Sequence, residues 1–183
     1  MALWGKSTSD ESRPKWLREN DKPANDLNRC FADQRGWVLR HANGFEEVLV
    51  TISGLSGAGS TTAGLGAATI AGVYFKAASY AKLATGTVIV NYNEKVTVSS
   101  GATIGVAGTT TWAIATAATQ TSVQQVEFTF TVPNVNQVIS IPAGSITGTI
   151  VDSGTSVVSD KLIANEDVKG VTGYGIVKTI SVA

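Results

Sequence analysis

The amino-acid sequence predicts a mostly β protein, in which an antiparallel β-sandwich follows an extended, irregular N-terminal segment. The first observation is composition, because the chain beyond residue 50 is rich in Thr, Val and Ile, which are stiff at χ1 and fit a pleated surface. The second is the period-two alternation of apolar and polar residues in several short runs. The third is the Gly, Pro, Asn and Ser residues that separate these runs, as the turns of a sandwich require.

Charge divides the chain near residue 50. Residues 1–50 hold 16 of the 28 charged side chains, eight basic and eight acidic, whereas residues 51–150 hold only five. A step of this size marks a boundary between two units. We therefore expect a charged, Trp-bearing docking segment over 1–50, a Gly/Ala/Thr-rich connecting region over 51–85, and the sandwich over 86–183.

Alternation locates the individual strands. We expect strands at residues 48–52, 87–93, 126–132, 138–141, 146–151 and 175–182. The run 126–132 is the clearest, because apolar side chains at every even position alternate with Glu127, Thr129 and Thr131. The strand at 48–52 stands alone before an uncharged stretch over 53–71, and a short, weak helix is allowed over 77–83.

Net charge and cysteine content limit the classes of partner. The formal net charge is zero, so there is no electrostatic reason to expect a nucleic acid or an acidic membrane, and nothing keeps copies of the chain apart. Cys30 is the single cysteine, which rules out an intrachain disulfide. No secretory leader or membrane-length apolar run is visible, so we expect a chain that stays soluble in the cytoplasm where it is made until it docks.

The sequence offers little for catalysis. An enzyme needs a base, a nucleophile or a metal in a small constellation, and His41 is the single histidine. None of the nearby serines lies in a Gly-x-Ser-x-Gly motif. The Gly-rich run 57–66 lacks the Gly-Lys-Ser/Thr ending of a phosphate-binding loop, so it predicts a flexible or closely packed loop. We expect no enzyme, no cofactor, and a surface or interface role for His41.

Metal binding has one weak candidate. A zinc site needs about four ligands, and Cys30 has no other ligand to combine with. Cys30 is therefore expected to pack as a small apolar side chain. Oxygen ligands that could hold calcium gather near the C-terminus, at Asp160, Asn165, Glu166 and Asp167. Their spacing matches no calcium loop, so a solvated turn is the expectation, and calcium between residues 160 and 167 is left open.

Four large aromatic residues stand in the polar N-terminal segment: Trp4, Trp16, Phe31 and Trp37. A helical hairpin could bury them locally, but prolines and glycines interrupt the segment and no apolar period near 3.6 is sustained. Large aromatics spaced along such a segment are typical of anchors set into pockets on other chains. We therefore take these four residues as candidate partner-binding residues.

Short motifs in both parts of the chain carry a family resemblance. MALWGK (1–6), FADQRGWVLR (31–40) and EEVLV (46–50) resemble the small virion structural proteins of contractile-tailed phages of marine cyanobacteria. VIVNYNEKVTV (88–98), FTFTV (128–132) and IPAGSI (141–146) resemble the bacterial Ig-like modules of surface and phage proteins. The Asp-rich ending of such modules is only partly present, as VDSG, so a metal is not carried over.

The resemblance implies a structural virion protein of a tailed phage. It would be a capsid decoration or cement protein, or a neck or tail accessory subunit, present in multiple copies or as a homo-oligomer and bound to other virion proteins. Neither family implies a catalytic residue. The alternative is a host- or carbohydrate-binding Ig-like module on a phage fibre. Aromatic residues lining one face of the β domain would favour it, the candidates being Tyr74, Tyr80, Tyr92, Trp112 and Tyr174.

Overall fold

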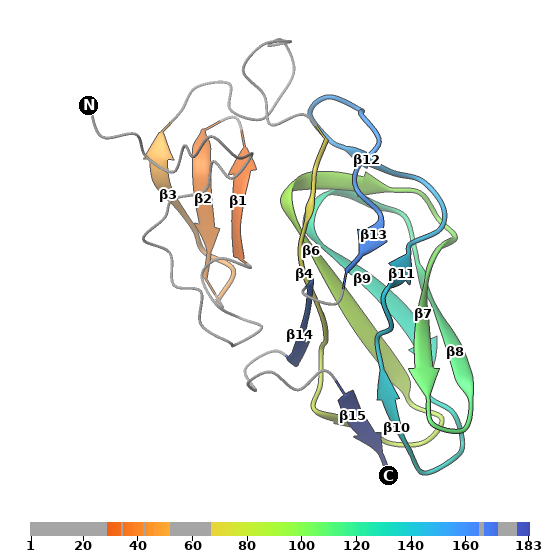
Figure 1. Cartoon of the computed structure of the whole chain (residues 1–183). Helices are drawn as coiled ribbons and strands as arrows, with labels where there is room; N and C mark the ends of the chain where they lie inside the picture. The colour runs from red at the N-terminus through yellow and green to blue at the C-terminus, as the bar shows by residue number, and fades with distance from the viewer. Residues whose placement is uncertain (1–28, 34, 42, 52–66, 165–166, 172–178) are drawn as a thin grey trace.

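The computed structural model describes residues 29–33, 35–41, 43–51, 67–164, 167–171 and 179–183. The strands are β1 (Cys30–Asp33), β2 (Gly36–Arg40), β3 (Glu46–Thr51), β4 (Ile70–Phe75), β5 (Ser79–Tyr80), β6 (Thr85–Val98), β7 (Ala102–Gly108), β8 (Trp112–Ala117), β9 (Gln120–Thr131), β10 (Gln137–Ser140), β11 (Gly144–Ser145), β12 (Ile150–Asp152), β13 (Leu162–Ile163), β14 (Val168–Val171) and β15 (Thr179–Val182). Every element named in the described part of the chain is a strand (Figure 1), so the expected mostly β class is confirmed.

The first three strands form an antiparallel meander in the order β1-β2-β3, here called the N-terminal meander. Its second turn is a tight one, in which the backbone N–H of Gly44 donates to the carbonyl of His41, and Gly44 adopts a φ of 86° that favours glycine. An irregular segment was expected over residues 1–50. For the described residues of the meander that expectation is wrong, and residues 1–28 lie outside the described part. The strand expected at 48–52 is not isolated, because β3 pairs with β2.

The meander is one edge of a mixed sheet of 13 strands, whose main path has the order β3-β2-β1-β6-β9-β8-β7-β10-β15-β5. The long strand β6 lies at its centre and also pairs with β4 and β12. Most pairs are antiparallel, as expected, but β1–β6, β14–β4 and β15–β5 are parallel. Parallel neighbours need long connections, and each of these three pairs joins strands that are far apart in the sequence.

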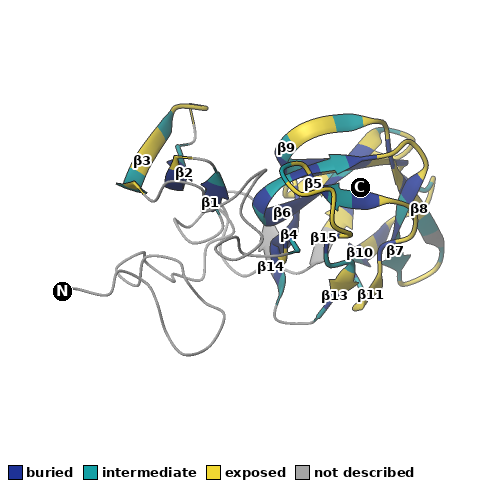
Figure 2. Cartoon of the chain, turned by 90° about the horizontal axis from the view of Figure 1, so that it is seen from above, coloured by how far each residue is buried: buried dark blue, intermediate teal, exposed yellow. Residues whose placement is uncertain are grey.

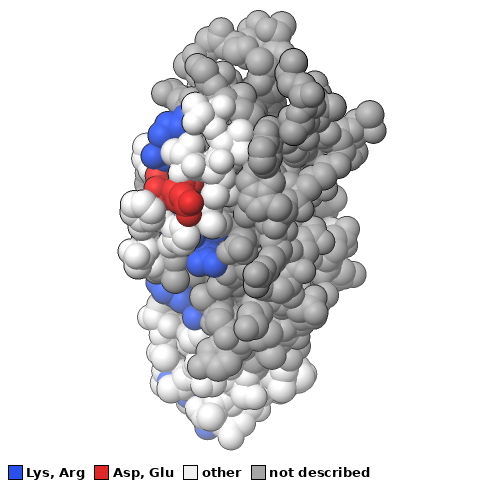
Figure 3. Space-filling model, turned by 90° about the vertical axis from the view of Figure 1, so that its left-hand side faces the viewer, with Lys and Arg blue, Asp and Glu red and all other residues white. Residues whose placement is uncertain are grey.

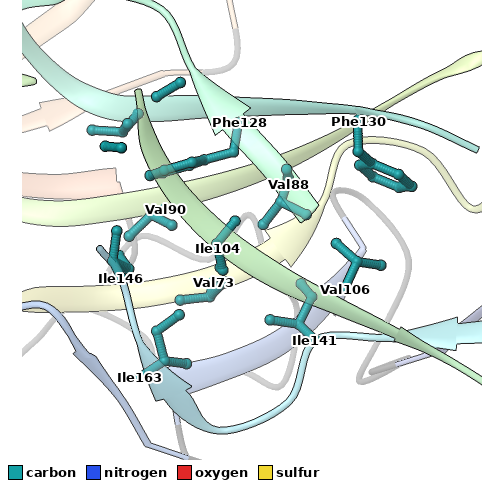
Figure 4. Close-up of a cluster of buried hydrophobic side chains, with 14 of the residues drawn as sticks. Val73, Val88, Val90, Ile104, Val106, Phe128, Phe130, Ile141, Ile146 and Ile163 are labelled. Carbon is teal, nitrogen blue, oxygen red and sulfur yellow. The ribbon is translucent and has the colours of Figure 1, made fainter. Parts of the chain in front are cut away.

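The sheet curls around a single large core. Seen from the front and from above (Figures 1 and 2), β7, β8 and β10 lie across this core from β4 and β6. The core cluster accordingly joins Val73 of β4, Val90 of β6, Ile104 of β7 and Ile139 of β10 (Figure 4 shows the first three). Burial of these β-branched side chains is the main favourable term that keeps the sheet curled around the core.

The alternation expected over residues 126–132 is confirmed. Val126, Phe128 and Phe130 are buried and point into the core, whereas Glu127 and Thr129 are exposed (Figure 4 labels the two phenylalanines). The strand expected at 87–93 lies within β6, and its apolar residues Val88, Val90 and Tyr92 are likewise fully buried. Period two in the sequence therefore identified the two strands that share the longest pairing in the molecule.

Three other expectations need correction. Residues 146–151 do not form one strand, because Gly148 has a φ of 83° and lies so close to Ala102 that a Cβ atom there would overlap it. No helix forms over 77–83, where Leu83 has a φ of 61° and β5 is the only element. The region 51–85 is not merely a connection, because β4 belongs to the sheet. Of the strand expected at 175–182, β15 is described and residues 172–178 are not.

Candidate functional site

A network of charged side chains covers the N-terminal meander. At the turn between β1 and β2, the Arg35 guanidinium donates from Nε to Oδ2 of Asp33 at 2.8 Å and from Nη2 to Oε2 of Glu46 at 2.6 Å. The hydrogen bonds to Asp33, and then those to Glu46, raise the pKa of Arg35 above its ordinary value. The Arg35 side chain is 47% exposed, so solvent screens these pairs and they fix geometry more than they add stability.

Lys95 of β6 connects this network to the larger part of the sheet. Its Nζ lies 3.7 Å from Oε1 of Glu46 and 5.3 Å from the centre of the Phe31 ring, a cation–π contact. Beside it, Ala32 of β1 pairs in parallel with Glu94 of β6. Figure 3 shows basic and acidic side chains close together on this side of the molecule. The meander therefore presents a charged surface that is attached to β6 through Lys95.

The tip of the β2–β3 hairpin carries the one feature that the sequence did not single out. Phe45 is 62% exposed there, with its ring 5.8 Å from the ring of His41. The backbone N–H of Phe45 donates to Oδ1 of Asn43, and the turn thereby holds the ring outward. A Phe directly after an Asn-Gly turn in a polar segment was the available signal. Phe45 is therefore the exposed aromatic of the meander.

His41 lies beside this tip. Its Nε2 is 2.8 Å from Oε2 of Glu47, and the two side chains are 39% and 51% exposed. The pair is on the surface of a hairpin, and neither residue lines the groove between β2 and β9. It has the form of a surface ion pair when the imidazole is protonated, consistent with the surface or interface role expected for His41.

The aromatic residues taken as anchors are placed differently. Phe31 is fully buried and Trp37 is 1% exposed, the latter packed with Cys30 and Ala32 against Val50. Both lie on strands whose neighbours cover them, so neither can reach into a pocket on another chain in this structure, and their assignment as anchors is corrected. Cys30 packs as a small apolar side chain, as expected. Trp4 and Trp16 lie outside the described residues.

A shallow groove of about 420 Å³ lies between the end of β2 and strand β9. Polar side chains from both line it, among them Arg40, Gln120, Gln125 and Glu127. Three of these are engaged with the protein itself, since the Gln125 amide donates to the Tyr74 hydroxyl at 3.2 Å. The Gln120 amide hydrogen-bonds both backbone groups of Glu127, and the Glu127 carboxylate accepts from Lys76 at 2.8 Å. The groove can offer hydrogen bonds to a polar ligand, but its best donors and acceptors already have partners.

The candidate metal and carbohydrate residues are not brought together. Among the described residues, no three His, Cys, Asp or Glu side chains could share a metal ion. Asp160 and Asp167 accept from backbone N–H groups as turn residues do, and residues 165–166 lie outside the description. Tyr74 and Tyr92 are buried, and the hydroxyl of half-buried Tyr80 donates to the Thr87 carbonyl. These three tyrosines therefore form no exposed platform, and Tyr174 and the Trp112 side chain are not described.

Comparison with models of protein families, with curated proteins and with solved structures finds no match to this chain. Within the described part of the chain, no helical segment has the length and apolar character that a membrane span needs. The function and the partners are therefore argued from the residues themselves.

Proposed function

We propose that this chain is a structural virion protein of a tailed phage, a capsid decoration or cement protein or a neck or tail accessory subunit, that binds other virion proteins. The observation that carries the proposal is the separation of charge. The described residues 29–51 carry six charged side chains of both signs, whereas strands β7 to β10 carry Glu127 alone. A charged surface of mixed sign selects a partner and fixes its register, as an assembling subunit requires. The chain would be made in the host cytoplasm and end in the virion.

The larger unit is proposed to be an Ig-like sandwich. The support is the curled sheet with one core, together with the position of the three motifs that resemble Ig-like modules. Residues 88–98 fall in β6, residues 128–132 at the end of β9, and residues 141–146 just beyond β10. Two of these motifs therefore lie on the two strands with the longest shared pairing. The sandwich would be the rigid body that the charged meander attaches to the particle.

Docking is proposed to use the exposed side of the meander and the segment before it. Phe45 supplies the aromatic anchor, because it is exposed at a hairpin tip and its backbone is held by Asn43. Glu47, which is exposed near this tip, and Arg35, which is exposed at the β1–β2 turn, supply charges that can pair with a partner. Trp4 and Trp16 stay proposed anchors of the extended segment that precedes the meander. No catalytic, cofactor or metal residue is proposed.

A host- or carbohydrate-binding module on a phage fibre is the second candidate. The polar groove beside Arg40 and Gln125 is the feature that favours it. Carbohydrate platforms are commonly aromatic, and Tyr74 and Tyr92 are unavailable for one because they are buried. We therefore rank this function below attachment to other virion proteins.

The test is a reconstitution with tailed particles that lack this protein. Purified full chain should sediment with the particles, and Phe45→Ala should weaken binding by about 2 kcal/mol, the loss that is usual for a well-packed anchor. Leu162→Ala, which truncates an apolar side chain that is 61% exposed outside the meander, is the matched control and should bind as the full chain does. Failure of the full chain to sediment with any tailed particle would overturn the virion assignment. Equal binding of the Phe45 variant and the full chain would show that the contact does not lie at the hairpin tip.

A further inference from the structure

The outer surface of strands β8, β7, β10 and β15 is a continuous sheet face on which no described side chain is charged. Pairing register puts its residues side by side, since Thr103 lies opposite Thr116, Gly105 opposite Ile114, and Ala107 opposite Ser140. Beyond β10, Val138 lies opposite Ser181 of β15. We call this set the uncharged face: Thr103, Gly105, Ala107, Ile114, Thr116, Val138, Ser140 and Ser181. The alternate residues of the same strands, such as Ile104 and Ile139, fill the core.

The uncharged face has a defined relief. Ile114 on β8 is 69% exposed and Val138 on β10 is 41% exposed, whereas β7 between them contributes Gly105 and Ala107. A Cβ atom on Gly105 would have Pro142 Cγ, at 3.9 Å, as its nearest neighbour, so the space above this glycine is open. Ile114 lies beside Gly105, and Val138 lies beyond the Ala107–Ser140 pair, so the face is a low floor along β7 with one apolar side chain near each end (Figure 1 shows the order of the strands).

Such a face is unusual for a sheet that meets only water. Soluble sheets normally carry charged side chains on their exposed positions, which keeps them from associating. Here the exposed Ile114 and Val138 stand among Thr, Ser, Ala and Gly, and none of the side chains described on this face is charged, whereas the described residues 29–51 carry six charged side chains. The molecule thus has two chemically different surfaces, and they fit different partners.

The absence of charge from this face favours a second copy of the chain as its partner. In a twofold interface each residue lies near its own equivalent, so a charged side chain would meet a like charge. A face without charges avoids this repulsion, and no ion has to be removed from water. The zero net charge likewise leaves no long-range repulsion between copies. We propose that two copies of the chain pack through their uncharged faces about a twofold axis, with Ile114 of each copy over the Gly105 floor of the other.

This pairing rests on the proposed function, because a subunit present in several copies per particle can associate with itself. The pairing and the binding to particles are measured separately. A chain that is monomeric in solution and still binds particles would overturn the pairing alone. A chain that dimerises and binds no particle would overturn the virion assignment alone.

The experiment measures the mass of the full chain by sedimentation velocity at concentrations up to about 1 mM, where even a weak contact is half occupied. Ile114→Lys and Val138→Lys each place two charges in the interface and should raise the dimer dissociation constant at least about tenfold. Val158→Lys is the matched control, since Val158 is an exposed apolar residue (60%) that lies between β12 and β13, and its dimer should be unchanged. If a lysine variant loses its melting transition, Thr116→Lys, already polar and exposed, takes its place. A full chain that is monomeric throughout, or a dimer that survives every lysine on the face, would overturn the pairing.

Discussion

Gly86 of β6 lies directly opposite Phe130 of β9, and the aromatic ring covers the position that a side chain on Gly86 would occupy. The ring has little freedom to move aside. Phe130 is 5% exposed, and its ring centre lies 6.4 Å from that of Phe75 and 6.0 Å from that of Tyr80. Glycine at position 86 is therefore part of the aromatic packing at this end of the core.

Gly86→Ala should destabilise the protein by about 1–3 kcal/mol, because the added methyl group displaces a packed ring. Urea unfolding measures the loss. Gly144→Ala is the matched control, since Gly144 lies in strand β11 and a methyl group there would meet nothing within 4 Å. That variant should unfold within about 0.5 kcal/mol of the parent chain or be more stable. Equal losses in the two variants would show that strand glycines matter here for backbone reasons and not for the Phe130 ring.

Local alternation explains how much of the fold could be predicted from the sequence. The strand containing Phe128 was predicted correctly, including which side chains are buried and which are exposed, because period two is a property of neighbouring residues. Strands β7 and β8 were not singled out, since their Thr, Ala and Gly residues contrast weakly in hydropathy. The break at Gly148 was missed because it depends on the approach of Ala102 from another strand, which no local pattern encodes.

The candidate site was less predictable for the same reason. Phe31 and Trp37 stand among charged residues in the sequence, and composition alone placed them on the surface. Trp37 is buried by packing against Cys30, Ala32 and Val50 from the neighbouring strands, and Phe31 lies beneath Lys95 of β6, far from it in the sequence. Phe45 was recognisable only in retrospect, from the Asn-Gly turn that precedes it. The sequence therefore showed that these two aromatic residues stand among charges, but not that both are buried.

Tyr92 should make stability fall in alkaline solution. Burial, and to a lesser extent the charge of Asp160, raises the pKa of Tyr92 above its ordinary value of 10.0. Above that pH the unfolded chain releases the phenolic proton while the folded chain keeps it, so the free energy of unfolding decreases as pH rises, by up to about 1.4 kcal/mol per pH unit. Below pH 10.0 the contribution is fully present.

Thermal unfolding between pH 8 and 12 would measure this effect. Tyr92→Phe should lower stability at neutral pH, because it removes the hydrogen bond to the Asp160 carbonyl, and should flatten the alkaline decline. Tyr80→Phe leaves Tyr92 in place and should keep the decline. An unchanged slope in the Tyr92 variant would assign the alkaline loss to other groups.

Gln137 should hold the turn between β7 and β8. Its Oε1 accepts from the backbone N–H groups of Thr110 and Thr111 at 3.1 and 3.2 Å, and its Nε2 donates to Oγ1 of Thr111 at 2.9 Å. Gln137→Ala should cost about 1–3 kcal/mol and speed amide exchange at both threonines. Thr111→Val removes only the hydroxyl and should cost less, without exposing the Thr110 amide. Unchanged exchange at the two amides in the Gln137 variant would contradict this role.

Lys95 should control the attachment of the N-terminal meander. Its Nζ lies over the Phe31 ring and near Glu46, so Lys95→Met removes the charge and keeps most of the apolar stem. Exposed cation–π contacts contribute about 0.5–1 kcal/mol, and the ion pair at 3.7 Å adds little because solvent reaches it. Hydrogen exchange should therefore show easier opening of β1 and β2 while the amides of β9 keep their protection.

A double-mutant cycle tests the contact itself. Phe31→Leu keeps an apolar side chain and removes the ring, so its effect and that of Lys95→Met should be coupled by about 0.5–1 kcal/mol. Lys76→Met is the matched control, because the Lys76–Glu127 pair is 2.8 Å long but about half exposed at both ends, and its loss should stay within about 0.5 kcal/mol. Additive effects of the Lys95 and Phe31 substitutions would mean that the meander is held by its backbone pairing with β6 and not by the cation over the ring.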